Sequence, residues 1–108
     1  MTDYFLIESR DPFECADVHA NGELAIALAQ AGHRVRYFLV QNAVLAARAA
    51  ARSNGLATIV RAGIPVLADE TSLRERGIQP AGLLAGVSPV PLELVVDALA
   101  AGSRVLWH

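Results

Sequence analysis

Short, continuously apolar runs alternate with segments of helical character along this chain, and the alternation restricts the fold more than any other feature. Buried strands are expected at residues 4–7, 35–40, 64–68, 83–87 and 105–107. Helices are expected from Asp11 to the residue before Gly32, over 43–52, over 73–76 and over 91–99. Strands that alternate with helices give right-handed crossovers and a mostly parallel sheet. The expected fold class is α/β, a three-layer α/β/α arrangement with about five strands, flavodoxin-like or Rossmann-like.

The chain has 108 residues, which predicts one domain, residues 1–108, with a single core. Its hydrophobic fraction of 54% is high for a domain of this size. The surplus apolar side chains are expected to cover one another between copies of the chain, so a homo-oligomer is predicted. The apolar segment 91–99 and the alanine-rich segment 43–52 are candidates for that interface, and burial against the sheet is the alternative.

Charge and composition exclude several classes of function. The net charge is −2 and all nine basic residues are arginines scattered along the chain, so nucleic acid is not an expected partner. The absence of lysine excludes a Schiff-base amine and a Walker-type phosphate site. Cys15 is the only cysteine, no secretory leader pattern opens the sequence, and the apolar runs are too short to span a bilayer. A cytoplasmic protein without membrane contact is expected.

Familiar cofactor and metal motifs are also missing. No G-x-G-x-x-G loop follows the first expected strand, and no serine stands in a G-x-S-x-G turn. His19, His33 and His108 lie far apart in the sequence and form no zinc-type spacing. The sequence therefore predicts neither a cofactor nor a metal.

Polar residues that could perform chemistry follow the first and third expected strands. They are Glu8, Ser9, Arg10 and Cys15 after the first strand, and Asp69, Glu70, Thr71, Arg74 and Arg76 after the third. The first and third strands of such sheets are often neighbours, so these residues are expected to line one pocket. In the alternative interpretation Asp69, Thr71 or Ser72 caps the helix and the arginines are solvated. A weaker hypothesis places Mg²⁺ between Glu8 and Asp69, and the missing lysine counts against it.

Several segments, taken in order, resemble one known family. They are Tyr4-Phe5-Leu6-Ile7, Ala27-Leu28-Ala29-Gln30-Ala31-Gly32-His33, Val35-Arg36-Tyr37-Phe38-Leu39, Asn42-Ala43-Val44, Leu73-Arg74-Glu75-Arg76-Gly77-Ile78 and Arg104-Val105-Leu106-Trp107. Together they resemble the DsrE/DsrF-like sulfur-relay proteins, relatives of the TusD subunits. The resemblance implies a cytoplasmic α/β protein that forms trimers or hexamers. It also implies that sulfane sulfur passes to other sulfur-relay proteins as a cysteine persulfide.

The resemblance places Asp69 at the reactive position of the family. The sulfur-carrying cysteine typically stands eight residues before the glycine that Gly77 matches, and a carboxylate cannot form a persulfide. The chain is therefore expected to be a non-canonical or accessory member, and a sulfurtransferase-type carrier only if Cys15 replaces the missing thiol. Cys15 is expected in the first turn of the first helix, where the helix dipole favours a thiolate. The alternative is an oligomeric module that binds a small polar ligand through Asp69, Glu70 and Arg74.

Overall fold

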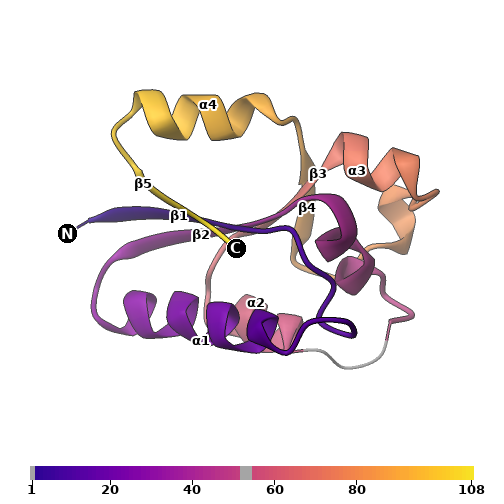
Figure 1. Cartoon of the computed structure of the whole chain (residues 1–108), viewed down its shortest axis with the longest axis horizontal. Coiled ribbons are helices and arrows are strands. Elements are labelled where there is room, and N and C mark those ends of the chain that lie inside the picture. Colours follow the sequence, from indigo (N-terminus) through magenta and orange to yellow (C-terminus); the bar gives the residue numbers. More distant parts are fainter. Residues whose placement is uncertain (1, 52–54) are drawn as a thin grey trace.

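The computed structural model describes residues 2–51 and 55–108. Five strands in these residues form one parallel sheet in the order β4-β3-β2-β1-β5 (Figure 1). The strands are β1 (Asp3–Glu8), β2 (Arg34–Leu39), β3 (Val66–Asp69), β4 (Val87–Val90) and β5 (Arg104–Trp107). The α-helices are α1 (Asp17–Gln30), α2 (Leu56–Arg61), α3 (Glu70–Glu75) and α4 (Glu93–Ala100). Two 3₁₀ helices complete the described elements, η1 (Gln41–Ala47) and η2 (Pro80–Gly82). The expected α/β class is confirmed.

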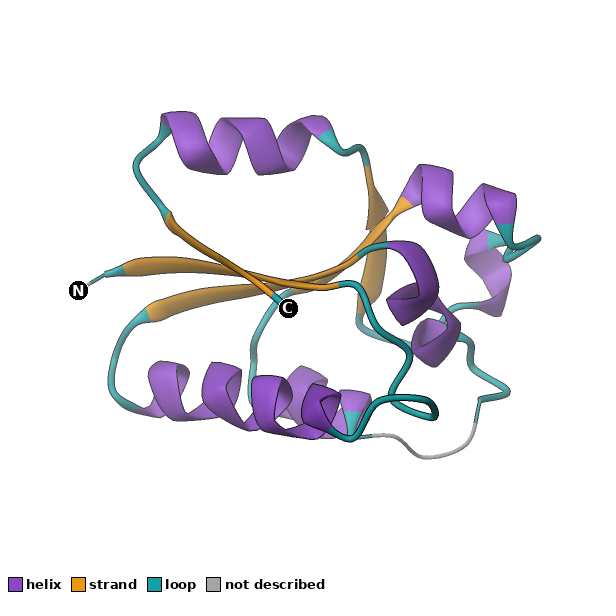
Figure 2. Ribbon diagram, viewed as in Figure 1, coloured by secondary structure: helices purple, strands orange, loops and turns teal. Residues whose placement is uncertain are grey.

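The two faces of the sheet are covered unequally. Helices α1 and α2 lie against one face and α4 lies against the other (Figure 2). Leu6 and Tyr37 are paired in register and point into the larger core, on the α1 side. Phe5, Ile7 and Phe38 point into the smaller core, under α4. The apolar runs of the central strands are continuous because both of their faces are buried.

The first helix begins later than the sequence predicts. Asp11 does cap a turn, since its Oδ1 accepts a hydrogen bond of 3.0 Å from the Phe13 N–H. The N–H groups of Glu14 and Cys15 then both donate to the Asp11 carbonyl, which closes one turn, and α1 starts only at Asp17. The expectation that Cys15 lies in the first turn of the helix was therefore wrong, because it lies in the connection that precedes α1.

Gly22, within α1, is explained by the packing of α1 on α2. A Cβ atom at this position would lie 3.1 Å from Cδ1 of Ile59, so glycine allows the two helices to approach closely. The helix continues through this residue without a break. Tertiary packing thus outweighs the cost of a glycine in the helix interior.

The segment after β2 differs most from the sequence expectation. An α-helix over 43–52 was predicted, but the chain forms the 3₁₀ helix η1 and then turns extended at Arg48, while Arg52 lies outside the described residues. Arg48 bridges to Leu83, and the backbone on both sides of it bonds to residues 82 and 84. These long-range bonds replace those of a longer helix. Helix α2 was not indicated by the sequence patterns, and β4 begins where the fourth strand was expected to end.

The strand order corrects one more expectation. Strands β1 and β3 are not neighbours, because β2 lies between them and pairs with both. The polar residues that follow β1 and β3 share one edge of the sheet but stand on opposite sides of β2. None of the helices in the described part of the chain has the length and apolar character needed to cross a membrane.

Candidate functional site

A buried carboxylate at the end of β1 organises the first group of polar residues. Glu8 is completely buried, and its Oε2 accepts a hydrogen bond of 3.0 Å from the Arg10 N–H. Its Oε1 accepts one of 3.2 Å from Nδ2 of Asn21. Nδ1 of His108 lies 2.8 Å from Oε1 and 3.0 Å from Oε2. These contacts hold the side chains of Asn21 and His108, and the backbone at Arg10, in fixed positions around the buried carboxylate.

His108 is held by its backbone as well as by its ring. Its N–H donates to the Ile7 carbonyl at 2.8 Å, and its own carbonyl accepts from the Ser9 N–H at 3.0 Å and from the Ser9 hydroxyl at 2.9 Å. These bonds continue the pairing of β5 with β1 by one residue. The imidazole is thereby placed above the end of β1, directly beside Glu8.

Cys15 lies next to this histidine. Its thiol is partly buried, and Nη1 of Arg10 donates to Sγ at 3.8 Å. Cys15 Sγ, a carboxylate oxygen of Asp17 and a ring nitrogen of His108 all lie within 4.8 Å of one another. The thiol of Cys15 and the imidazole of His108, which the Glu8 carboxylate orients, are thus brought together although His108 lies far from both residues in the sequence.

This arrangement can activate a thiol. A carboxylate accepts hydrogen bonds, so His108 donates from Nδ1 to Glu8 and its Nε2 remains available to accept a proton. The general pattern of nucleophilic catalysis combines a nucleophile, a base and a group that orients the base. The guanidinium of Arg10 favours negative charge on the sulfur, and the carboxylate of Asp17 opposes it.

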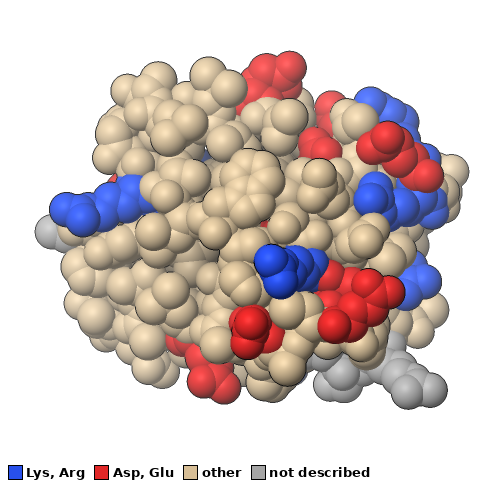
Figure 3. Space-filling model, in the orientation of Figure 1, with Lys and Arg blue, Asp and Glu red and all other residues tan. Residues whose placement is uncertain are grey.

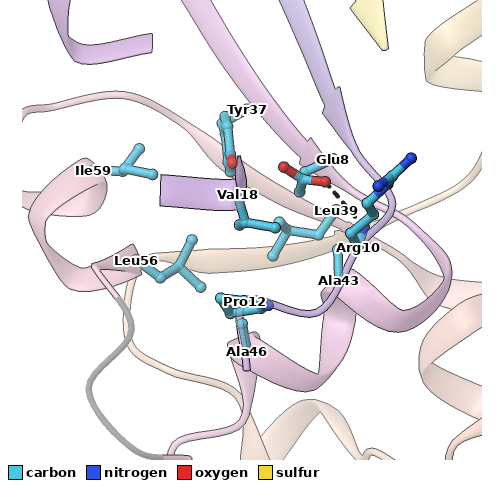
Figure 4. Close-up of a pocket in the computed structure, with 10 residues that line it drawn as sticks. All are labelled: Glu8, Arg10, Pro12, Val18, Tyr37, Leu39, Ala43, Ala46, Leu56 and Ile59. Atoms are coloured by element: carbon cyan, nitrogen blue, oxygen red, sulfur yellow. Dashed lines mark hydrogen bonds between the residues drawn. The ribbon is translucent and has the colours of Figure 1, made fainter. Parts of the chain in front are cut away.

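A small cavity lies under the same carboxylate (Figure 4). Its volume is about 20 Å³, and it is lined by Glu8, Arg10, Pro12, Val18, Tyr37, Leu39, Ala43, Ala46, Leu56 and Ile59. That volume suits one water molecule and is far below that of a ligand pocket. Burial, together with the negative charge of Glu8, raises the pKa of Tyr37 well above its usual value, and a hydrogen bond with Asn21 opposes the shift. The cavity is therefore part of the buried surroundings of Glu8 and is not a ligand pocket.

Asp69, at the end of β3, caps helix α3. Its side chain is only 4% exposed, and its Oδ2 accepts from the Ser72 N–H at 3.0 Å and from the Ser72 hydroxyl at 2.7 Å. The Ser72 oxygen in turn accepts from the Gln41 N–H at 2.9 Å. The other carboxylate oxygen of Asp69 is buried without a hydrogen-bond partner among the described residues. The capping interpretation of Asp69 is confirmed.

The remaining predicted site residues near α3 are occupied by local contacts. Arg74 is exposed and donates to the Thr71 hydroxyl at 3.3 Å. Arg76 donates from Nη1 to the Ser72 carbonyl at 3.2 Å, and from Nη2 to Oδ1 of Asn42 at 3.0 Å. Arg76 therefore joins α3 to η1. Glu70 is half-buried at the first position of α3, and the cavity beside Glu8 is lined by none of these side chains.

A sequence model of the DsrE/DsrF-like family matches residues 3–108, which is nearly the whole chain. The chain belongs to the DsrE/DsrF-like family. Among solved structures, the ychN protein from E. coli is 23% identical with a TM-score of 0.88, and each chain is covered completely. MTH1491 from Methanobacterium thermoautotrophicum is 20% identical with a TM-score of 0.81, over 98% of this chain and 100% of that one. Identities this low show that the fold is shared.

A third solved structure has a similar fold. BT1422 from Bacteroides thetaiotaomicron is 16% identical with a TM-score of 0.73, over 98% of this chain and 95% of the other. Curated protein sequences give no match. The fold of this DsrE/DsrF-like protein is thus recognised over nearly the whole chain.

In this DsrE/DsrF-like protein the structure divides the predicted site residues into two groups. Glu8, Ser9, Arg10 and Cys15 gather at the end of β1, while those of the β3 group stay around α3, beyond β2. Both oxygens of Glu8 are engaged by hydrogen bonds, and β2 separates β1 from the strand of Asp69, so the arrangement does not favour Mg²⁺ between Glu8 and Asp69.

His108 is the site residue that the sequence analysis did not select. It directly follows the run that forms β5, and in a parallel sheet every strand delivers its carboxyl end to the same edge. That rule, applied to the last strand as well as to the first and third, would have identified it.

Charged side chains do not form a continuous basic surface on the face shown in Figure 3. Blue arginine side chains are separated there by red acidic ones and by large uncharged areas.

Proposed function

We propose that this DsrE/DsrF-like protein carries sulfane sulfur as a persulfide on Cys15, in place of a cysteine at position 69. The observation that supports the proposal most strongly is the placement of the thiol between Arg10 and a histidine oriented by Glu8. Thiolates, not thiols, are the nucleophiles in sulfur exchange, and a cationic neighbour and an oriented base both favour the thiolate. Family membership makes sulfur the expected cargo.

The reaction is a transfer of sulfane sulfur between two thiols. His108 accepts the proton of Cys15, and the resulting thiolate attacks the outer sulfur of a donor persulfide, R–S–SH. The sulfur–sulfur bond of the donor breaks, R–S⁻ leaves, and Cys15 becomes Cys–S–SH. The proton held by His108 then neutralises the leaving thiolate. No electrons are gained or lost overall, so no external oxidant or reductant is needed.

Mass spectrometry of the intact protein tests the proposal. The reduced chain is incubated with a small-molecule persulfide donor, and a mass increase of one sulfur atom is expected on the wild type but not on Cys15→Ser. The variant Arg10→Gln is expected to persulfidate more slowly, because it removes the positive charge next to the sulfur. Glu14→Gln changes a neighbouring exposed charge and serves as the control.

An unmodified Cys15 would overturn the carrier proposal. The chain would then be expected to act as an accessory member, which contributes the scaffold to a sulfur-relay complex but no thiol chemistry. A second test concerns the base: persulfidation that is unaffected by His108→Gln would show that the histidine is not the base.

A further inference from the structure

We propose that Cys15, Asp17 and His108 form a binding site for a transition-metal ion of the Zn²⁺ type. The sulfur, the carboxylate oxygen and the ring nitrogen already lie within 4.8 Å of one another. Around a tetrahedral Zn²⁺ such atoms stand roughly 3.3 to 3.6 Å apart, given metal–ligand distances of about 2.0 to 2.3 Å. Closing the site requires side-chain movements on the order of 1 Å, which the exposed Asp17 can make.

The kinds of ligand atom point to the kind of metal. A thiolate and an imidazole favour Zn²⁺ and similar ions over Mg²⁺ or Ca²⁺, which prefer oxygen. Three protein ligands leave one coordination position open for water or an incoming group. The site therefore differs in chemistry from the Mg²⁺ site considered for Glu8 and Asp69.

Glu8 supplies the support that a metal-binding histidine needs. Its carboxylate holds Nδ1 of His108 at 2.8 Å, which leaves Nε2 as the ring nitrogen available to bind a metal. A histidine that binds a metal through one nitrogen usually donates the other N–H to a carboxylate or carbonyl, and this second contact orients the ring. Here the supporting carboxylate is completely buried, which makes the orientation rigid.

The connection between β1 and α1 positions the other two ligands. The Cys15 N–H donates to the Asp11 carbonyl at 3.0 Å, and the Cys15 carbonyl accepts from the Val18 N–H at 3.3 Å. Asp17 is the first residue of α1. The backbone that carries the two ligands is thus fixed at the helix start, and only their side chains have to move.

Arg10 opposes the metal. Its guanidinium donates to Cys15 Sγ at 3.8 Å, and a cation so close to the sulfur repels a second cation. Arg10 is exposed and long, so its side chain can leave the sulfur when a metal arrives. Removal of this charge should therefore strengthen metal binding.

The inference does not depend on the proposed sulfur transfer, since the three ligands would bind a metal whether or not Cys15 carries sulfur. The two ideas do share one atom. A metal bound to Sγ occupies the electron pair that would attack a persulfide, so Zn²⁺ is expected to block persulfidation of Cys15.

Titration of the reduced, chelator-treated chain with Co²⁺ tests the inference directly. Saturable binding of one Co²⁺ per chain is expected, with a sulfur-to-cobalt charge-transfer band that Zn²⁺ abolishes by competition. Cys15→Ser should remove the band, and Asp17→Asn and His108→Gln should each weaken binding at least about tenfold. His19→Gln and Glu14→Gln, which change nearby groups outside the cluster, should leave the affinity unchanged.

Two variants sharpen the test. Glu8→Gln should weaken Co²⁺ binding by roughly 10- to 100-fold through loss of the supporting carboxylate, in a variant whose circular dichroism shows that it is folded. Arg10→Gln should strengthen Co²⁺ binding, whereas it should slow persulfidation. These opposite signs make failure of the metal site distinguishable from failure of the sulfur carrier.

Three results would overturn the metal site. One is the absence of a charge-transfer band in the wild type. Another is wild-type affinity in both Asp17→Asn and His108→Gln. The third is a stoichiometry of one metal per two chains, which would indicate a bridge between two cysteines in place of the cluster.

Discussion

At the scale of single residues, Asp69 and Cys15 differ in what their side chains contact. Asp69 occupies the family's reactive position but uses one carboxylate oxygen to cap α3. Cys15 stands outside that position but has a cationic neighbour and a histidine. The position of a residue in a motif therefore does not fix its role, which depends on what its side chain contacts.

Replacement of Asp69 tests the capping role. Asp69→Ala should lower the free energy of unfolding by about 1 to 2 kcal/mol, because the N–H and hydroxyl of Ser72 lose their acceptor. Asp69→Asn keeps an acceptor and should cost clearly less. Urea denaturation measures both, and persulfidation of Cys15 should be the same in both variants. Equal stability of wild type and Asp69→Ala would contradict the capping role.

Tyr37 gives the chain a predictable dependence on alkaline pH. Burial, with the negative charge of Glu8, raises the pKa of Tyr37 in the folded protein, so the folded state favours the neutral phenol. The stabilisation is complete below a pH of about 10, where the unfolded phenol titrates, and is lost above it by about 1.4 kcal/mol per pH unit. Because the chain contains no lysine, few other groups titrate in this range.

Urea denaturation between a pH of about 8 and about 11 measures this effect. The free energy of unfolding should fall less steeply above a pH of about 10 in Tyr37→Phe than in the wild type, with Tyr4→Phe as the matched control. Cys15→Ser as the common background removes the thiol from the comparison. Parallel curves for Tyr37→Phe and Tyr4→Phe would refute the assignment.

At the scale of elements, the contact between α2 and the start of β4 depends on a glycine. Gly86 has a φ of +94°, and a Cβ atom there would lie 2.4 Å from Cγ1 of Val60. Gly102 has a φ of +83°, and a Cβ atom there would meet no heavy atom within 4 Å. The two glycines therefore share a left-handed backbone but differ in packing.

Substitution of each glycine by alanine separates the cost of a left-handed backbone from the cost of the contact with Val60. Gly102→Ala should cost about 1 to 2 kcal/mol for the left-handed backbone alone. Gly86→Ala should cost roughly 1 to 3 kcal/mol more, because Val60 has to move. The double variant Gly86→Ala/Val60→Ala should recover part of the difference in a double-mutant cycle. An equal loss of stability in the two single variants would show that the Val60 side chain moves away without a measurable energetic cost.

The elements were predicted unevenly from the sequence. The three strands β1, β2 and β5 and the helix α4 were recognised closely, since their apolar runs and starting residues are local signals. The start of α1, the 3₁₀ helix η1 and helix α2 were not, and the end of η1 depends on partners far along the chain. Arg48, for example, turns extended to bridge Leu83.

At the scale of the whole molecule, the most exposed large apolar side chains of the described residues lie in or near α4 and on β5. Leu92, just before α4, and Val96 and Leu99 within it are 51%, 64% and 58% exposed, and Trp107 on the edge strand β5 is 63% exposed. Trp107 pairs in register with Ile7, which points into the core under α4, so its side chain leaves the sheet on that side. We propose that copies of the chain associate through this surface, as trimers or hexamers.

Sedimentation velocity and tryptophan fluorescence test this assembly. The wild type should sediment as an oligomer, and dilution should shift the emission of Trp107 to the red as the side chain becomes solvated. Val96→Asp should shift the protein toward the monomer, because it buries a charge in an apolar interface. Ala27→Asp, at an exposed position of α1, is the matched control. A monomeric wild type would refute the proposal.

The sequence by itself determined the α/β class, the family resemblance and the carboxylate at the reactive position, because these reside in local patterns and in the order of segments. It also identified Glu8, Arg10 and Cys15 as residues at a strand end. Only the tertiary structure decided which of these residues meet. Parallel pairing of β5 with β1 brings His108 beside Cys15 and Glu8, although nearly the whole chain lies between them, and the insertion of β2 separates them from Asp69. Strand order depends on the packing of the entire sheet, and no local pattern encodes it.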